Sequence, residues 1–167
     1  QGQAFEGKFK SKTVRKYIHG HADRFDESVD MIRAVRSKKY KYFKNFHPEK
    51  PYYLPLAFRE RLPSMQELLR MRDAGELDEN QSLWFRKTKP EEELFDTEND
   101  PHELNNIAND PQYAEILLEM RQECVDWMNS IDDKGLIKEK ELIELFYPSR
   151  KARQTESPII DITTNNV

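Results

Sequence analysis

The chain contains one cysteine, Cys124, among its 167 residues, so a disulfide bond within the chain is excluded. A single thiol also leaves oxidising and reducing compartments equally open. No apolar run reaches the length that crosses a membrane, and we expect no membrane partner. The formal net charge of −4 is small and predicts neither a strongly basic nor a strongly acidic partner, with nucleic acid not expected.

An initiating methionine and a signal sequence are also lacking, because the sequence begins with Gln1. We therefore expect a processed product or a fragment. Apolar residues make up only 37% of the chain and charged residues 35%, which indicates a small core or a part that packs against a larger body. The length suits one domain with a core and is too short for two large domains.

Apolar and aromatic patterning predicts four short strands that form a small, mostly antiparallel sheet. A polar stretch at residues 20–27 is predicted to be a loop after the first strand. The predicted strands cover residues 13–19, 29–36, 40–46 and 93–96.

An insertion, residues 47–92, separates the third predicted strand from the fourth. Its first part holds four prolines, which favour an extended path along the surface. A capping box at Ser64 predicts a helix that ends at Ala74, with Gly75 as its C-terminal stop. A second cap-like start at Asp78 leads into an apolar anchor at residues 83–85.

The stretch at residues 93–113 joins the last strand to the helices. Asp100, Pro101 and Glu103 form a capping box that predicts a short helix, and Asp110 followed by Pro111 repeats the signal. The long helix that follows should lie across one face of the sheet, because its apolar residues recur at helical spacing. These are Tyr113, Leu117, Met120, Cys124, Trp127, Met128 and Ile131. The pattern is typical of an α+β fold, with a short helix at residues 139–146 and a polar tail after it.

Three blocks of the sequence resemble the C-terminal region of bacterial type I sulfatases, the formylglycine-dependent sulfate-ester hydrolases. LFDTENDPHELNNI, at residues 94–107, is similar to the family pattern LYDL-x-x-DP-x-E-x-x-NL, with Phe95 for the usual Tyr and Ile107 for the usual Leu. The other blocks are IRAVRSKKYKYFKNFHPEKPYY at residues 32–53 and QGQAFEG at residues 1–7. The resemblance covers residues 1–131.

The resemblance implies the C-terminal subdomain of the alkaline-phosphatase-like sulfatase fold, at residues 1–135, followed by an extension at residues 136–167. It implies a sulfuric ester hydrolase whose catalytic half is absent from this chain, with an N-terminal catalytic domain as its partner and a sulfated small molecule or glycan as its substrate. Calcium and formylglycine are implied for the whole enzyme, together with a periplasmic or secreted location. We expect this chain alone to be inactive.

His21, Asp23 and Arg24 are the candidate substrate-binding residues. A hydrogen-bonding loop with an arginine suits an anionic sulfate ester, because the guanidinium presents a planar fork to oxyanions. A salt-bridged surface loop, with Arg24 paired to Asp26 or Glu27, accounts for the same residues without function. The residues alone favour the surface loop. The resemblance makes the two interpretations about equal, since the matching loop in the family lies toward the cleft.

Other motifs are interpreted as structural. The YPSR stretch at residues 147–150 resembles the sulfatase nucleophile motif, but Phe146 stands where an oxidisable Cys or Ser is needed. Cys124 falls on the apolar stripe of the long helix, where an inert buried thiol is expected. The histidines and acidic residues are not spaced as metal ligands would be. The lysines at residues 38–44 are more typical of a hairpin strand that faces water than of a nucleic-acid site.

Two other functions stay open from the sequence. One is a stand-alone, non-catalytic binding module. The other is part of a related phosphatase or phosphodiesterase of the same superfold, because kinship of fold does not determine chemistry. The sequence leaves open which sulfate ester would be used.

Overall fold

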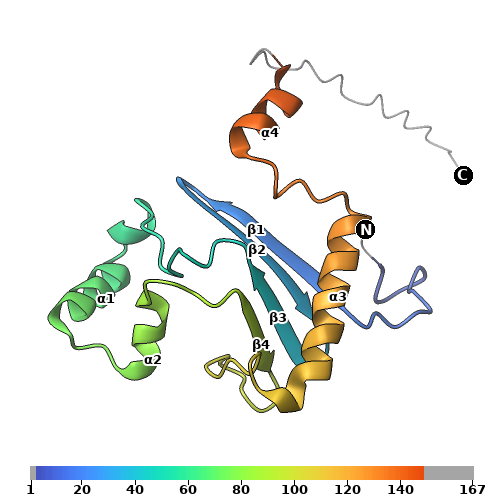
Figure 1. Ribbon diagram of the computed structural model, residues 1–167, viewed down its shortest axis with the longest axis horizontal. Coiled ribbons are helices and arrows are strands. Elements are labelled where there is room, and N and C mark those ends of the chain that lie inside the picture. The colour runs from blue at the N-terminus through green and yellow to red at the C-terminus, as the bar shows by residue number, and fades with distance from the viewer. Residues whose placement is uncertain (1–2, 149–167) are drawn as a thin grey trace, which may run out of the picture. The chain divides into compact units, whose positions relative to one another are not determined.

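The computed structural model describes residues 3–148 and separates the chain into two units, residues 1–133 and residues 134–167. The first unit holds a four-stranded antiparallel sheet in the order β1-β2-β3-β4, with the long helix α3 on it (Figure 1). The predicted α+β fold, with a small antiparallel sheet and a long helix across it, is confirmed. The strands are β1 (Ile18–Phe25), β2 (Ser28–Arg36), β3 (Tyr40–Asn45) and β4 (Glu92–Asp96), and the α-helices are α1 (Pro63–Ala74), α2 (Glu79–Ser82), α3 (Ala114–Ser130) and α4 (Glu139–Phe146).

The first strand lies later in the chain than the sequence predicts. β1 pairs with β2 from Ile18 opposite Arg36 to Phe25 opposite Ser28. Residues 20–25, predicted to be loop, therefore belong to this strand. The turn follows at Asp26, whose φ of 46° is left-handed. β1 is an edge strand, so backbone hydrogen bonds to β2 can hold it without an apolar face. For this reason the predicted strand at residues 13–19 is wrong except at Ile18 and His19, and the predicted loop at residues 20–27 is wrong except at Asp26 and Glu27.

A β-bulge interrupts the pairing of β1 with β2. Ala22 pairs with Ile32 and Arg24 pairs with Val29, so two β2 residues, at positions 30 and 31, lie opposite Asp23 alone. Both of these neighbours, Asp30 and Met31, are buried, although successive residues of a regular strand point to opposite faces. The bulge therefore turns a carboxylate into the interior.

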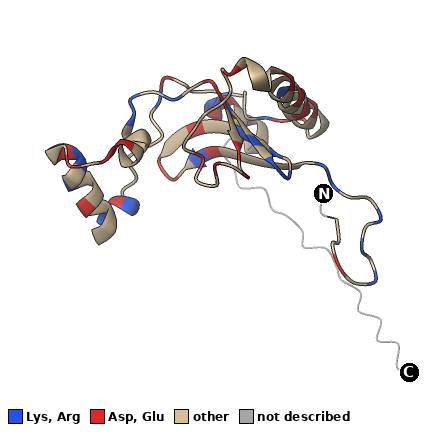
Figure 2. Ribbon diagram, turned by 90° about the horizontal axis from the view of Figure 1, so that it is seen from below, with Lys and Arg blue, Asp and Glu red and all other residues tan. Residues whose placement is uncertain are grey.

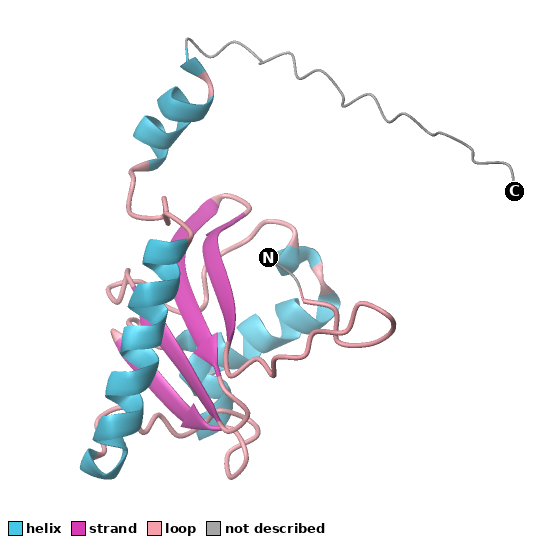
Figure 3. Ribbon diagram, turned by 90° about the vertical axis from the view of Figure 1, so that its right-hand side faces the viewer, coloured by secondary structure: helices cyan, strands magenta, loops and turns pink. Residues whose placement is uncertain are grey.

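α3 lies against one face of the sheet (Figure 3), and the core lies between them. Val35, Tyr42 and Leu94 contribute one residue each from β2, β3 and β4, and they pack against Met120 and Cys124 of α3. All five are almost completely inaccessible to solvent. Burial raises the pKa of the Cys124 thiol to about 11, which agrees with an inert structural cysteine.

The connection before α3 differs in part from the prediction. Asp110 caps the start as predicted, accepting from the backbone N–H of Gln112, and the 3₁₀ turn η3 (Pro111–Tyr113) leads into α3. The short helix predicted after Asp100 does not form. Glu103 has a left-handed backbone with a φ of 56°, and its carboxylate binds Lys41 Nζ at 2.8 Å instead of reaching back to a helix start.

The insertion carries α1, α2 and two 3₁₀ turns, η1 (Arg59–Arg61) and η2 (Leu83–Phe85). The predicted stop at Gly75 is confirmed by its left-handed φ of 70°, as is the capping box at Asp78. The predicted cap at Ser64 is wrong, because α1 begins one residue earlier with Pro63 in its first turn and no side-chain cap. Tyr53 is buried and makes ring contacts with Trp84 and Phe85 of the apolar anchor.

Acidic and basic residues are mixed on the sheet, whereas α3 carries four acidic residues and one basic residue (Figure 2). The basic residue, Arg121, binds the sheet. Both Glu92 carboxylate oxygens accept from the Arg121 guanidinium at 2.7 Å, and the Tyr42 hydroxyl donates to the same carboxylate at 2.6 Å. The Arg121 hydrogen bonds lower the pKa of Glu92 below its ordinary value of 4.5. Because this pKa is lower in the folded chain than in the unfolded one, ionised Glu92 stabilises the fold above pH 4.5. The contribution is lost as the pH falls through the pKa of the folded chain.

We expect Arg121→Gln to lower the free energy of unfolding by about 1 kcal/mol near neutral pH, since the pair is partly exposed. The difference from the unsubstituted protein should shrink as pH falls below 4.5, where Glu92 becomes protonated in the unfolded chain and then in the folded one. Amide hydrogen exchange in β4 and α3, followed at neutral and acidic pH, measures this difference. A deficit that stays constant with pH would contradict the assigned ion pair.

Candidate functional site

The three predicted substrate-binding residues lie on β1 rather than in a loop. His21 pairs with Arg33 across the sheet, and Asp23 Oδ1 accepts from Arg33 Nη2 at 2.8 Å, so His21 and Asp23 share the face that α3 covers. Arg24 alternates to the opposite face, and its Nε donates to the Asp26 carbonyl oxygen at 2.8 Å. The structure thus brings two of the three residues together and separates the third.

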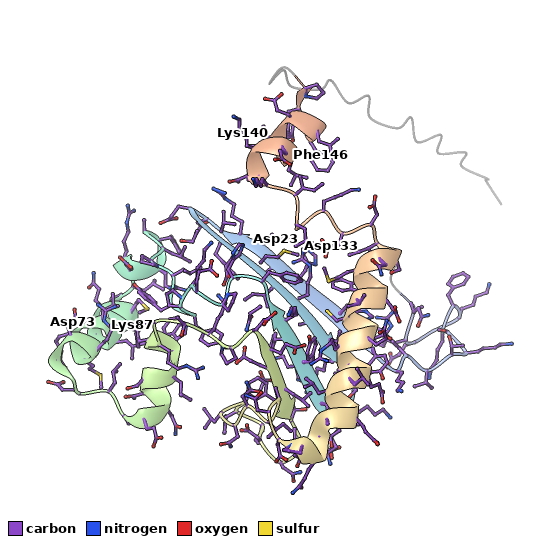
Figure 4. The ribbon with its side chains drawn as sticks, in the orientation of Figure 1. Asp23, Asp73, Lys87, Asp133, Lys140 and Phe146 are labelled. Atoms are coloured by element: carbon purple, nitrogen blue, oxygen red, sulfur yellow. The ribbon has the colours of Figure 1, made fainter. Side chains whose placement is uncertain are left out.

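Arg33 connects this end of β1 to the end of α3. Its side chain is buried, and its Nε and Nη2 donate to the two Asp133 carboxylate oxygens at 2.6 and 2.8 Å. Its Nη1 donates to the carbonyl oxygens of Ala22 and Ile32. Figure 4 shows Asp23 on β1 and Asp133 just after α3, side by side at this end of the sheet.

The charge of Arg33 is maintained despite its burial. Burial alone would lower the pKa of Arg33, but the hydrogen bonds that the guanidinium donates to Asp133 and Asp23 outweigh it and raise the pKa. The sequence contained a signal for this site, because the alternation of β2 places Arg33 between Met31 and Val35 on the core face. A buried arginine requires carboxylate partners, but the pattern does not say which ones.

A second group of contacts attaches β1 to α3. The His19 ring stacks on Trp127 with centroids 4.9 Å apart, and its Nε2 lies 2.9 Å from Glu123 Oε1. His21 approaches the same indole, with a centroid distance of 6.4 Å. Both histidines of β1 are therefore placed by α3, and His21 keeps an exposed edge beside the partly exposed Asp23 carboxylate.

The opposite face of the sheet carries a pocket of about 480 Å³ that sequence reasoning missed. It joins three segments that lie far apart in the sequence: the sheet, the insertion and the loop before α3. Its lining combines aromatic rings with amide, carboxylate, hydroxyl and guanidinium groups. The lining residues are Ile32, Phe43, Asn45, Tyr52, Asn80, Leu83, Trp84, Arg86, Glu93, Phe95, His102, Glu103, Leu104 and Asn106.

Within residues 3–148, no three His, Cys, Asp or Glu side chains are grouped as a metal site would require. No helix in the same range is both long and apolar enough to cross a membrane. The nucleophile-like stretch is only partly visible: Phe146 ends α4 half exposed, whereas Ser149 and Arg150 lie outside the described residues.

No protein-family model matches the chain, but known proteins are similar to it. An ulvan-active sulfatase of Formosa agariphila is 50% identical over 168 residues, which cover 100% of this chain and 28% of that protein. The human N-sulphoglucosamine sulphohydrolase is 26% identical over 120 residues, which cover 65% of this chain and 23% of that protein. A solved structure of a putative sulfatase from Bacteroides thetaiotaomicron superposes with a TM-score of 0.44 at 22% identity, covering 74% of this chain and 18% of that one. The chain thus spans about a quarter of the length of these curated relatives, and the match is to their C-terminal portion.

Proposed function

This chain belongs to the sulfatases and corresponds to their C-terminal portion, and from that premise we propose that the whole protein hydrolyses sulfate esters. The observation that carries the proposal is the 50% identity that extends over the full chain. The chain contributes a wall of the substrate cleft and the packing that closes the fold. The catalytic step belongs to an N-terminal catalytic domain, which is its partner.

The proposed substrate is a sulfated glycan. The relative from Formosa agariphila is named for activity on ulvan, which makes ulvan oligosaccharides the first substrate to test. A polysaccharide substrate also agrees with the exposed polar side chains of His21 and Asp23 at the end of β1. A periplasmic or secreted location follows from the same proposal, since such polymers are met outside the cytoplasm.

We assign residues 1–135 to the C-terminal subdomain, with residues 47–92 as its insertion, and residues 136–167 to a C-terminal extension. Calcium and formylglycine would complete the whole enzyme, supplying a bound cation and the nucleophile. The described residues offer no group of three metal ligands, so no step of the reaction is assigned here to either group.

His21, Asp23 and Arg24 are our proposed substrate contacts at the end of β1. Asp23 keeps 45% of its side chain exposed while Arg33 fixes its orientation, which suits a carboxylate that receives a sugar hydroxyl. His21 can donate from its exposed ring, and the guanidinium of Arg24 suits a sulfate or carboxylate group on a neighbouring sugar. Because Arg24 lies on the other face, it would contact a different part of an extended glycan.

The test measures sulfate release from ulvan oligosaccharides by the full-length protein. Phosphate release from a phosphate monoester of the same sugar is measured beside it, because such an ester represents the competing substrate class. We expect release of sulfate and no comparable release of phosphate. His21→Ala and Arg24→Gln should each raise KM about tenfold, because each removes one charge-assisted or polar contact to the substrate.

His47→Ala and Arg61→Gln are the matched controls, because they change the same residue types within the insertion, and their KM should stay unchanged. Preferential hydrolysis of the phosphate ester would replace the sulfatase proposal with the phosphatase alternative. Equal KM values for His21→Ala, Arg24→Gln and the two controls would remove the β1 residues from the substrate site.

A further inference from the structure

The pocket on the sheet face opposite α3 has a lining rich in hydrogen-bond acceptors. Asn45 is 1% exposed, and its Nδ2 donates to the Pro90 carbonyl oxygen at 2.7 Å and to Glu93 Oε2 at 2.9 Å. Its Oδ1 is buried and lacks a hydrogen-bond partner. An unsatisfied buried acceptor is costly, so this amide indicates a place where a ligand donates a hydrogen bond.

Glu93 and Tyr52 extend the same polar cluster. Glu93 is 5% exposed, and its carboxylate accepts from the neutral Asn45 amide. The buried Tyr52 hydroxyl has no partner with hydrogen-bond geometry, although burial and the nearby Glu93 carboxylate raise the pKa of this phenol. A cluster of acceptors that includes a carboxylate favours a ligand with several hydroxyl donors and disfavours a phosphate.

Aromatic rings form the apolar part of the pocket. Phe43 and Phe95 meet edge to face at 6.2 Å on the sheet. Trp84 stands across from them on the insertion and is held by Tyr53 at 5.5 Å and by the Arg59 guanidinium at 5.1 Å. A fixed indole beside a polar cluster suits a ring with one apolar face and a hydroxylated edge, which describes a pyranose.

Arg86 supplies the positive charge of the lining. Its Nε donates to the Leu83 carbonyl oxygen at 2.9 Å, and its guanidinium lies 5.2 Å from the Tyr52 ring centre. This places one planar donor group beside the acceptor cluster. Glu103, the other charged residue of the lining besides Glu93, is already paired with Lys41 at 2.8 Å.

We propose that this pocket is a saccharide subsite that binds one sugar ring of an acidic glycan. The apolar face of the ring lies on Trp84, and its hydroxyl groups donate to Asn45 Oδ1, Glu93 and the Tyr52 hydroxyl oxygen. A carboxylate or sulfate of the glycan meets Arg86. The inference rests on the proposed function only for the choice of glycan. The alternative to a sugar in this pocket is another part of the full-length protein, which would fill the same space.

Calorimetric titration of the full-length protein with a desulfated ulvan tetrasaccharide tests the proposal, because hydrolysis of a sulfate cannot change this probe. We expect Tyr52→Phe to weaken binding about fivefold and Trp84→Leu about tenfold, as expected for the loss of one hydrogen bond and one ring contact. Tyr52→Phe removes one hydroxyl and keeps the ring and its packing, so the fold should be retained. Tyr42→Phe is the matched control on the α3 face and should leave the dissociation constant unchanged.

Three results would overturn the subsite: a tetrasaccharide that does not bind the unsubstituted protein, equal affinity in all variants, or a Trp84→Leu variant that loses thermal stability while it binds normally. The last result would show that the pocket is filled by the rest of the protein. Sulfate release from the intact oligosaccharide is measured separately. If the enzyme releases sulfate but the variants bind the tetrasaccharide with unaltered affinity, the subsite is contradicted and the proposed function is not.

Discussion

Arg33→Met should reduce the protection of β1, β2 and the end of α3 against amide hydrogen exchange by a factor of roughly 150 to 5,000, equivalent to a loss of about 3–5 kcal/mol. Arg33 is 1% exposed and holds both oxygens of Asp133, whose side chain is 9% exposed. Removing the guanidinium takes away the group that binds both oxygens of this largely buried carboxylate, and it also releases Asp23 from Arg33.

Arg36→Met is the matched control for this prediction. Arg36 lies on the same strand, but its side chain is 43% exposed and its ion pair with Glu103 is 3.9 Å long. Exposed pairs of this kind contribute at most about 1 kcal/mol. The protection of the Arg33→Lys variant should lie between those of the other two, since lysine keeps the charge but cannot bind both carboxylate oxygens at once. Equal protection in the Arg33→Met and Arg36→Met variants would show that Arg33 does not organise this end of the sheet.

Lys89→Met should destabilise the other side of the sheet by about 3–5 kcal/mol. Lys89 Nζ lies 2.6 Å from Asp30 Oδ2, and the two side chains are 0% and 3% exposed. The bulge turns Asp30 into the interior, and its Oδ1 has no partner. Without the ammonium, a fully buried carboxylate would have to be hydrated or protonated, and either change opens the contact between β2 and the insertion.

A double variant separates the loss of the pair from the loss of packing. Lys89→Met combined with Asp30→Leu replaces both charges with apolar groups and should recover most of the stability that Lys89→Met loses. Exchange of the β2 and β4 amides measures both variants, with the exposed Lys87→Met as the control. A double variant as unstable as the single one would mean that Lys89 acts through its packed stem and not through its charge.

The parts of the fold with strong local patterns were predictable. Alternation located β2, β3 and β4 to within a residue or so at each end, and helical spacing located α3 and the face that it buries. Gly75 and Asp78 were predictable as well, because a left-handed stop and a capping box depend only on neighbouring residues.

β1 shows why other parts were not predictable. Its residues are as polar as those of a loop, and they form a strand because β2 offers an unpaired edge, which is a property of the partner strand. The short helix expected after Asp100 is absent for a related reason. Glu103 is drawn to Lys41, 62 residues away, and a tertiary ion pair overrides the local capping signal.

The candidate sites depend on such long-range contacts even more strongly. Arg33 and Asp133 are 100 positions apart, and Lys89 and Asp30 are 59 positions apart. His21 and Asp23 could be proposed from residue type alone, but their shared face, and the separation from Arg24, required the register of β1. The pocket joins three segments of the chain, so no single stretch of sequence contains its pattern.

Peptide mapping by mass spectrometry on the natively expressed protein tests the central claim most directly. If this chain is the C-terminal portion of a sulfatase, the native protein is much heavier than 20.0 kDa. Its peptides should then include an upstream Cys-x-Pro-Ser-Arg or Ser-x-Pro-Ser-Arg sequence whose first residue carries the mass change of formylglycine. A native protein of 20.0 kDa without such a peptide would contradict the enzyme assignment and leave the non-catalytic binding module as the function of this chain.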